Sequence, residues 1–180
     1  MESYERTMEK KEIIENTLLE MMQQLPYEQI SVMQIIQRLG VSRRTFYRNF
    51  ASKDACFCSL TDRIIQNLYL KMHDSHPHAQ SMYQVYFAYW YKNQDFLRCV
   101  LRNNLKDVFA NRFCHHARTE ERIFLQRISS PIAGCDEDIL QFYSQGTVAI
   151  LMNWARRDFD TSVENMARKM EQVIYRPLID

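Results

Sequence analysis

The 180-residue sequence predicts an all-α protein of about nine helices. Only three glycines and four prolines are present, so long stretches contain no residue that ends a helix. Apolar residues recur at helical spacing through most of these stretches, and residues that cap helices stand where several patterns begin. We place an N-terminal three-helix domain at residues 1–50 and a C-terminal helical bundle at residues 51–180.

The first predicted helix covers Arg6–Leu25. Its apolar residues fall on one helical face, and its charged residues occupy most of the remaining surface. Pro26 ends this helix, because proline disfavours a helical conformation in the residue before it.

Two helix caps eleven residues apart predict a helix–turn–helix. Ser31 is a suitable N-cap for a helix over Val32–Leu39. Gly40 suits the position after that helix, where a left-handed backbone costs glycine little. Ser42 then caps a third helix.

This third helix is expected to run to about Asn49, with Phe46 and Phe50 packed inward and the polar side chains outside. The surrounding stretch, residues 29–53, contains five Lys or Arg and no Asp or Glu, in a chain whose net charge is only +1. A basic helix–turn–helix is suited to the DNA major groove. The residues therefore predict a DNA-binding element.

Ser52 is expected to cap a fourth helix that continues to about Met72, which is long enough to pass from the N-terminal domain into the bundle. Residues 73–81 then form a break. The next helix, at residues 82–91, is apolar nearly all round, so we expect it to be buried on most sides.

Four further helices complete the predicted bundle. Asp95 is expected to cap the first of them, and the second spans residues 105–128. After another break, a helix covers residues 139–157. The last helix opens with Thr161 and Glu164, which have the spacing of a capping box.

At residues 31–53 the sequence resembles the TetR family of bacterial transcriptional regulators. The segment from Gly146 to Trp154, followed by a capped last helix, looks like the C-terminal region of a subgroup from low-GC Gram-positive bacteria. The resemblance implies an all-α homodimer whose variable C-terminal domain often senses a small molecule. Ile36 and Arg44 depart from the family pattern, which commonly has a small residue and a glycine there. The matching residues are Ser31, Ile35, Gly40, Val41, Ser42, Thr45, Tyr47, Phe50 and Lys53.

Contacts with double-stranded operator DNA are expected on the third helix and its flanks. Arg43 and Arg44 are long enough to donate to guanine edges, although a solvated basic face is the alternative. The other expected contacts are to phosphates, or to a thymine methyl in the case of Thr45. They are Ser31, Thr45, Tyr47, Arg48, Asn49 and Lys53.

The aromatic helix at 82–91 is a candidate effector pocket. Its Tyr hydroxyls and Trp N–H would supply the few polar groups that such pockets use. The alternative is a buried central helix whose polar groups are satisfied within the core. The candidate pocket residues are Tyr83, Tyr86, Phe87 and Trp90.

Gly146 lies in the middle of a predicted helix, which costs about 1 kcal/mol relative to alanine. Close approach of another helix is one reason to bear that cost. We expect the last two helices of each chain to form a homodimer interface, which would present two recognition helices to successive major grooves. Its predicted residues are Gly146, Ile150, Trp154, Met166, Met170 and Val173.

No motif predicts an enzyme, a cofactor or a metal site. The sequence has no glycine-rich phosphate loop, HExxH or GxSxG. Cys56 and Cys58 are expected on opposite sides of a helix, which leaves a redox pair as the weaker interpretation. The histidines and neighbouring cysteine that invite a metal interpretation lack zinc-ligand spacing; they are His73, His76, His78, Cys114, His115 and His116.

The start of the sequence has no signal-peptide pattern, and no apolar run reaches membrane-spanning length. Five scattered cysteines fit reduced thiols. We therefore expect a cytoplasmic protein that is nucleoid-associated when bound to DNA and has no membrane partner. The expected function is an operator-binding repressor released by a small-molecule effector. The alternative is a DNA-bound interaction protein whose C-terminal domain recognises a protein partner.

Overall fold

The computed structural model describes residues 2–74, 82–127, 134 and 136–175. Within these residues the chain forms nine α-helices and no strand, which confirms the predicted fold class. A short 3₁₀ turn, Tyr27–Gln29, follows the first helix. The helices are α1 (Glu2–Gln24), α2 (Val32–Leu39), α3 (Arg43–Asn49), α4 (Lys53–Asp74), α5 (Met82–Lys92), α6 (Gln94–Arg102), α7 (Lys106–Arg127), α8 (Glu137–Arg156) and α9 (Val163–Tyr175).

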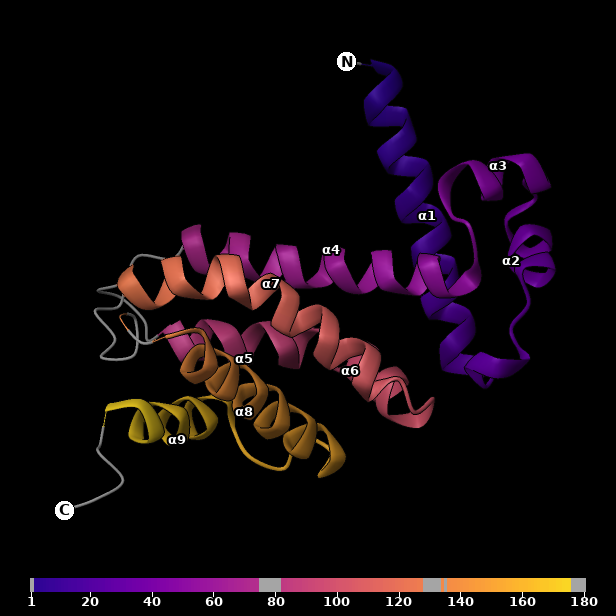
Figure 1. Cartoon of the computed structure of the whole chain (residues 1–180). Helices are drawn as coiled ribbons and strands as arrows, with labels where there is room; N and C mark the ends of the chain where they lie inside the picture. The colour runs from indigo at the N-terminus through magenta and orange to yellow at the C-terminus, as the bar shows by residue number, and fades with distance from the viewer. Residues whose placement is uncertain (1, 75–81, 128–133, 135, 176–180) are drawn as a thin grey trace.

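Helix α4 joins the two ends of the molecule (Figure 1). It packs against α1 at the end where α2 and α3 lie, and against α7 in the bundle. Below it in Figure 1, α5 packs on α9, while α8 packs on α6 and α7. The Ser52 hydroxyl accepts a hydrogen bond from the Ala55 N–H at 3.0 Å, as expected for an N-cap of α4.

The bundle is filled largely by aromatic rings. Trp90 and Trp154 are fully buried; the Trp90 ring lies 5.5 Å from that of Phe109, and the Trp154 ring lies 5.5 Å from that of Phe87. Burying a large apolar side chain of this kind stabilises the fold by about 1.5–3 kcal/mol. None of the described helices combines the length and apolar content needed to cross a bilayer.

Two predicted helix caps are wrong. Asp95 does not cap α6, because the helix starts one residue earlier at Gln94; its carboxylate instead pairs with Arg98 at 3.1 Å. Thr161 does not open a capping box, because the Ser162 hydroxyl accepts from the Asn165 N–H at 3.3 Å at the start of α9. The Thr161 carbonyl accepts a hydrogen bond from the buried Trp154 indole at 2.9 Å instead.

Candidate nucleic-acid interface

Helix α2 is defined at both ends by local hydrogen bonds. The Ser31 hydroxyl accepts from the Gln34 N–H at 3.2 Å, and the Gln34 side chain accepts in return from the Ser31 N–H at 2.7 Å. Gly40 ends the helix at φ 65°, in the left-handed region that glycine tolerates. The sequence predicts the caps Ser31 and Gly40, and the structure adds Gln34 as the partner that completes a capping box.

A short turn after Gly40 connects α2 to α3. The Ser42 hydroxyl caps α3 by accepting from the Thr45 N–H at 3.1 Å. On its inner side α3 is anchored by Phe46 and Phe50, which are 0% and 4% exposed and whose ring centroids lie 5.9 Å apart. These anchors leave the opposite side of α3 in solvent.

Arg44 and Arg48 are the basic side chains of α3 that remain available. Both are exposed, and neither makes a hydrogen bond or ion pair within the described part of the chain. Arg43 is also exposed, but its Nε lies 3.1 Å from the Met33 sulfur on α2. Arg38 on α2 is engaged with α1, where it contacts Glu20 at 3.4 Å.

Two other predicted DNA contacts, Asn49 and Lys53, already use their side chains in intramolecular hydrogen bonds. The Asn49 amide donates to the Thr45 carbonyl at 2.7 Å, and both residues are half-buried. The Lys53 ammonium donates to the Tyr27 carbonyl at 2.6 Å and lies 4.0 Å from the centre of the Tyr27 ring. Burial lowers the pKa of Lys53, against the opposing effect of Asp54. Tyr47, at 56% exposed, stays open to solvent.

Sequence comparison places this element in a known family. The family model for bacterial regulatory proteins of the tetR family matches residues 14–60, from α1 into α4. A second family model, described as a transcriptional regulator C-terminal region, matches residues 77–176, which is more than half of the chain. The chain belongs to the TetR family. Operator binding and dimerisation are what membership of this family implies.

The TetR-family fold also appears among solved structures. One match, the dihydroxyacetone kinase operon activator DhaS, is 22% identical, with a TM-score of 0.57 over 91% of this chain and 93% of that chain. At this identity the likeness concerns the fold. No curated protein matches the sequence.

The structure separates the four predicted effector residues into two groups. Tyr83 and Tyr86 line a cavity of about 20 Å³ between α4, α5, α7 and α8. Phe87 and Trp90 are fully buried in the core. The Trp90 indole N–H is buried with no acceptor in hydrogen-bond range among the described residues.

The predicted interface residues also separate into two groups. Trp154, Met166 and Met170 are 0–3% exposed and belong to the core of the single chain. They were expected at an interface because the apolar stripe of a helix looks the same in sequence whether it faces the chain's own core or a partner. Val173 is 39% exposed, and an added Cβ at Gly146 would meet nothing within 4 Å.

The described histidines and cysteines form no metal site. No group of three or more His, Cys, Asp or Glu in the described ranges is arranged to hold an ion. His73 lies 3.3 Å from Glu120, and His116 lies 3.0 Å from Asp62. Two of the histidines considered above, His76 and His78, lie outside the described residues.

Burial disfavours the thiolate form of both Cys56 and Cys58. Cys56 is buried and Cys58 half-buried, and both are free thiols. Burial raises the pKa of Cys56 to about 12 and also raises the pKa of Cys58. A raised thiol pKa leaves little of the reactive thiolate.

Sequence reasoning missed the contacts that join the end of α1 and the turn after it to the end of α6. The Tyr27 N–H donates to the Asn103 side-chain oxygen at 2.6 Å, across 76 residues of sequence. Next to it, the Arg102 guanidinium donates to the Met22 carbonyl in the last turn of α1. No local pattern signals these bonds, because each partner is an ordinary helix-end residue.

Proposed function

We propose that this TetR-family protein is an operator-binding repressor that acts as a homodimer and is released by a small-molecule effector. The observation that carries the proposal is the outer side of α3, where Arg44 and Arg48 are exposed and unpaired among the described residues. An α-helix fits into the DNA major groove, and arginines on it that have no intramolecular partner can donate hydrogen bonds to guanine edges or to phosphates. Arg44 is therefore our first candidate for base recognition.

The other predicted DNA contacts receive more specific roles. Arg43 reads bases from a position supported by Met33, and Tyr47 reaches phosphate. The hydroxyls of Ser31 and Thr45, the Asn49 amide and the Lys53 ammonium have local partners. We propose that these four residues shape the element and contribute at most secondary phosphate contacts.

We further propose that two chains pair through the outer face of α8. Phe142 is 72% exposed and Ile139, one helical turn away, is 41% exposed, so the two side chains form a neighbouring exposed apolar pair of the kind found at interaction sites. Gly146 and Ile150 continue this stripe at helical spacing, and the open space at Gly146 lets a second helix approach. Val173 on α9 is a further candidate on the exposed surface.

The proposed effector site is the aromatic cavity beside Tyr83 and Tyr86. Its lining contains no charged side chain, so we expect a neutral effector. A volume of about 20 Å³ accommodates about one water molecule. An effector must therefore favour a conformation in which this cavity is larger, and it shifts the population only by its differential affinity for that conformation. Phe87 and Trp90 pack against Tyr86, with ring centroids 5.0 Å and 6.3 Å from its ring.

The division into functional domains stays as proposed from the sequence, with DNA binding at residues 1–50 and effector binding and dimerisation at residues 51–180. Helix α4 connects the two because it packs on both α1 and α7. A regulator works where the DNA is, so we propose action in the cytoplasm at the nucleoid, without membrane, metal or cofactor, and without catalytic activity.

The second candidate function is a DNA-bound interaction protein that responds to a protein partner. The small aromatic cavity and the exposed Phe142 favour this alternative. The structural match named as an operon activator also makes activation a competing outcome.

Selection of bound genomic fragments tests the proposal. The purified protein should enrich a near-palindromic site, and a reporter downstream of that site should rise when the gene for this protein is deleted. A fall in the reporter would establish activation instead. Retention of only random fragments would contradict operator binding altogether. If a metabolite fraction, and not a protein fraction, dissociates the protein from this site, the result supports a small-molecule effector.

A further inference from the structure

Tyr27, in the turn between α1 and α2, is held from two sides. On one side, at the end of α6, the Asn103 side-chain oxygen accepts from the Tyr27 N–H at 2.6 Å. On the other side, at the start of α4, the Lys53 ammonium donates to the Tyr27 carbonyl at 2.6 Å. There the Tyr27 hydroxyl also donates to the Asp54 carboxylate at 2.6 Å. Tyr27 is buried, so a group that loses its partner there is costly.

The Asn103 amide is oriented by its own helix. Its nitrogen donates to the Cys99 carbonyl in the last turn of α6 at 2.8 Å, which leaves the side-chain oxygen for the Tyr27 N–H. The backbone just after it is also held, because the Leu105 N–H donates to the Val100 carbonyl at 2.9 Å. The end of α6 therefore presents a fixed acceptor to the turn after α1, which reduces the entropy lost when the hydrogen bond forms.

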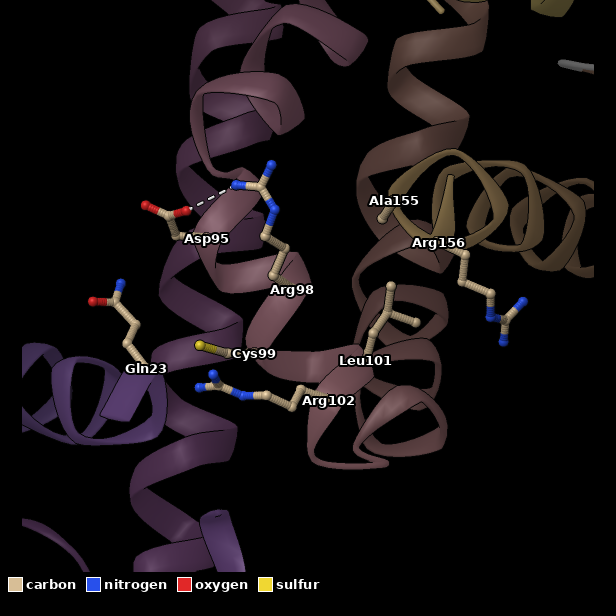
Figure 2. Close-up of a pocket in the computed structure, with 8 residues that line it drawn as sticks. All are labelled: Gln23, Asp95, Arg98, Cys99, Leu101, Arg102, Ala155 and Arg156. Atoms are coloured by element: carbon tan, nitrogen blue, oxygen red, sulfur yellow. Dashed lines mark hydrogen bonds and ion pairs between the residues drawn. The ribbon is translucent and has the colours of Figure 1, made fainter. Parts of the chain in front are cut away.

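A second hydrogen bond joins the same two regions. The Arg102 guanidinium donates to the Met22 carbonyl in the last turn of α1. Figure 2 shows the Arg102 side chain extending from α6 toward Gln23 of α1. Arg102 and Gln23 also line a groove of about 740 Å³ between α1, α6 and α8. The joint therefore borders an open space, which gives the end of α1 room to shift when these hydrogen bonds open.

This joint lies between the helix that we propose for pairing and the recognition helix. Tyr27 is four residues before Ser31, whose hydroxyl caps α2, and α2 leads through a short turn into α3. On the other side of the joint, α6 packs on α8. The hydrogen bond between Asn103 and Tyr27 thus connects α8 to the helix–turn–helix in addition to the connection through α4.

We propose that Asn103 is a positioning residue that sets the spacing between the two recognition helices of the dimer. The role rests on the proposed function, because spacing has a meaning only for a dimer bound to two half-sites. One base pair added between half-sites moves one of them by about 3.4 Å and turns it by about 35°. Fixing the turn before α2 to the bundle restricts the dimer to one such arrangement. Without the hydrogen bond, α2 and α3 take more orientations relative to α8, and the dimer tolerates other spacings.

Binding of the full chain to duplexes of different spacing tests this role. The duplexes carry the near-palindromic site from the selection, either unchanged or with one base pair added or removed at its centre. We expect the wild type to prefer the unchanged spacing. Asn103→Ala removes the acceptor, and one hydrogen bond shifts an equilibrium by about two- to tenfold, so the ratio of the two affinities should fall by about that factor. A variant that is only less stable would bind all duplexes more weakly and keep the ratio.

Two further variants separate the hydrogen bond to Tyr27 from the one within α6. Asn103→Asp keeps an oxygen for the Tyr27 N–H but loses the donor to Cys99, so it should keep the wild-type ratio. Asn93 is the matched control, because its amide also donates to the carbonyl four residues earlier, that of Tyr89, at 2.8 Å. Its side chain makes no hydrogen bond to another helix among the described residues, so Asn93→Ala should keep the ratio. If Asn103→Ala does not fold, Asn103→Ser, whose side chain is too short to reach Tyr27, decides in its place.

Hydrogen exchange of the free protein tests the hydrogen bond without DNA. The Tyr27 amide should exchange at least about tenfold faster in Asn103→Ala. The Gln29 amide, which donates to the Pro26 carbonyl at 3.0 Å in the same turn, should be unchanged.

The outcomes separate this role from the proposed function. Unchanged exchange at Tyr27, no spacing preference in the wild type, or a full preference in Asn103→Ala overturns the role of Asn103 while operator binding stands. A selection that yields no site overturns the proposed function, and the spacing role with it.

Discussion

Arg44, like Arg48, differs from the other basic residues around it in having no intramolecular partner among the described residues. Arg38 is paired with Glu20, and the Lys53 ammonium donates to the Tyr27 carbonyl. A charge that is already satisfied gains less from DNA than an unpaired one, because its internal contact must be given up. In the sequence these basic residues look alike. Only their contacts in the structure show which side chains are available to bind DNA.

Replacing Arg44 should therefore reduce specificity more than replacing Lys53. We expect Arg44→Ala to weaken binding to the selected site by about 1–3 kcal/mol, with a smaller loss on random DNA. Fluorescence anisotropy at two salt concentrations measures both, with Arg157→Ala as the matched arginine control. An equal loss on both DNAs would show that Arg44 contacts only phosphate.

Lys53→Ala should act mainly on stability. It removes the hydrogen bond to Tyr27 and the contact with the Tyr27 ring, so we expect the free energy of unfolding to fall by about 1–2 kcal/mol. Urea denaturation measures this change. A stable variant with strongly reduced DNA affinity would instead make Lys53 a direct phosphate contact.

At the scale of the element, the turn between α2 and α3 depends on Gly40. The residue has φ 65°, and an added Cβ would find open space, so backbone conformation alone opposes substitution. We expect Gly40→Ala to lower the free energy of unfolding by about 1–2 kcal/mol. Gly40→Asn should cost less, because asparagine tolerates this region. Equal costs for the two variants in urea denaturation would contradict a conformational cause.

Helix α8 carries the prediction about assembly. Phe142 is 72% exposed on its outer face, and Leu70 on α4 is an equally prominent apolar side chain at 60%. Phe142→Asp should convert a dimer into a 21.7 kDa monomer in light scattering, whereas Leu70→Asp should not. The reason is that an interface excludes water from its central side chains, where an unpaired charge is costly. If the Phe142→Asp variant remains a dimer, the interface does not include this face of α8.

At the scale of the molecule, adjacent residues of α4 connect it to two different neighbours. Arg63 pairs with Glu15 of α1 at 2.5 Å, and Ser59 donates to the same carboxylate at 2.7 Å. Asp62 accepts from Arg112 of α7 at 2.7 Å. The positions of α1 and α7 are therefore linked through a single turn of α4.

Breaking the first link should destabilise the whole chain. Glu15 is 1% exposed, so Glu15→Gln leaves Arg63 without its buried counter-ion, and we expect a loss of about 3 kcal/mol in the free energy of unfolding. Glu12 pairs with the same Arg63 at 2.9 Å but has a 53% exposed side chain, so Glu12→Gln should cost less than about 1 kcal/mol. If the two variants lose similar free energies of unfolding in urea denaturation, the burial of Glu15 does not make its ion pair with Arg63 more important than that of Glu12.

The helix–turn–helix could be predicted from sequence almost residue by residue. Helices α2 and α3 begin and end as expected, because Ser31, Gly40 and Ser42 act on backbone groups within a few residues. The errors at Asp95 and Thr161 have a related origin. Several neighbouring residues could serve as caps there, and the packing of Trp154, whose indole donates to the Thr161 carbonyl, sets the conformation around one of them.

By itself, the sequence determined the number of helices, their approximate bounds and the basic face of α3, since these follow from periodicity and local hydrogen bonds. The tertiary structure decided which apolar stripes are core and which are surface: Trp154 is buried, while Phe142 on the same helix is exposed. It also decided where Arg102 and Asn103 hold α1. The physical reason is that these contacts join residues far apart in the chain, and no local pattern records which surfaces will meet.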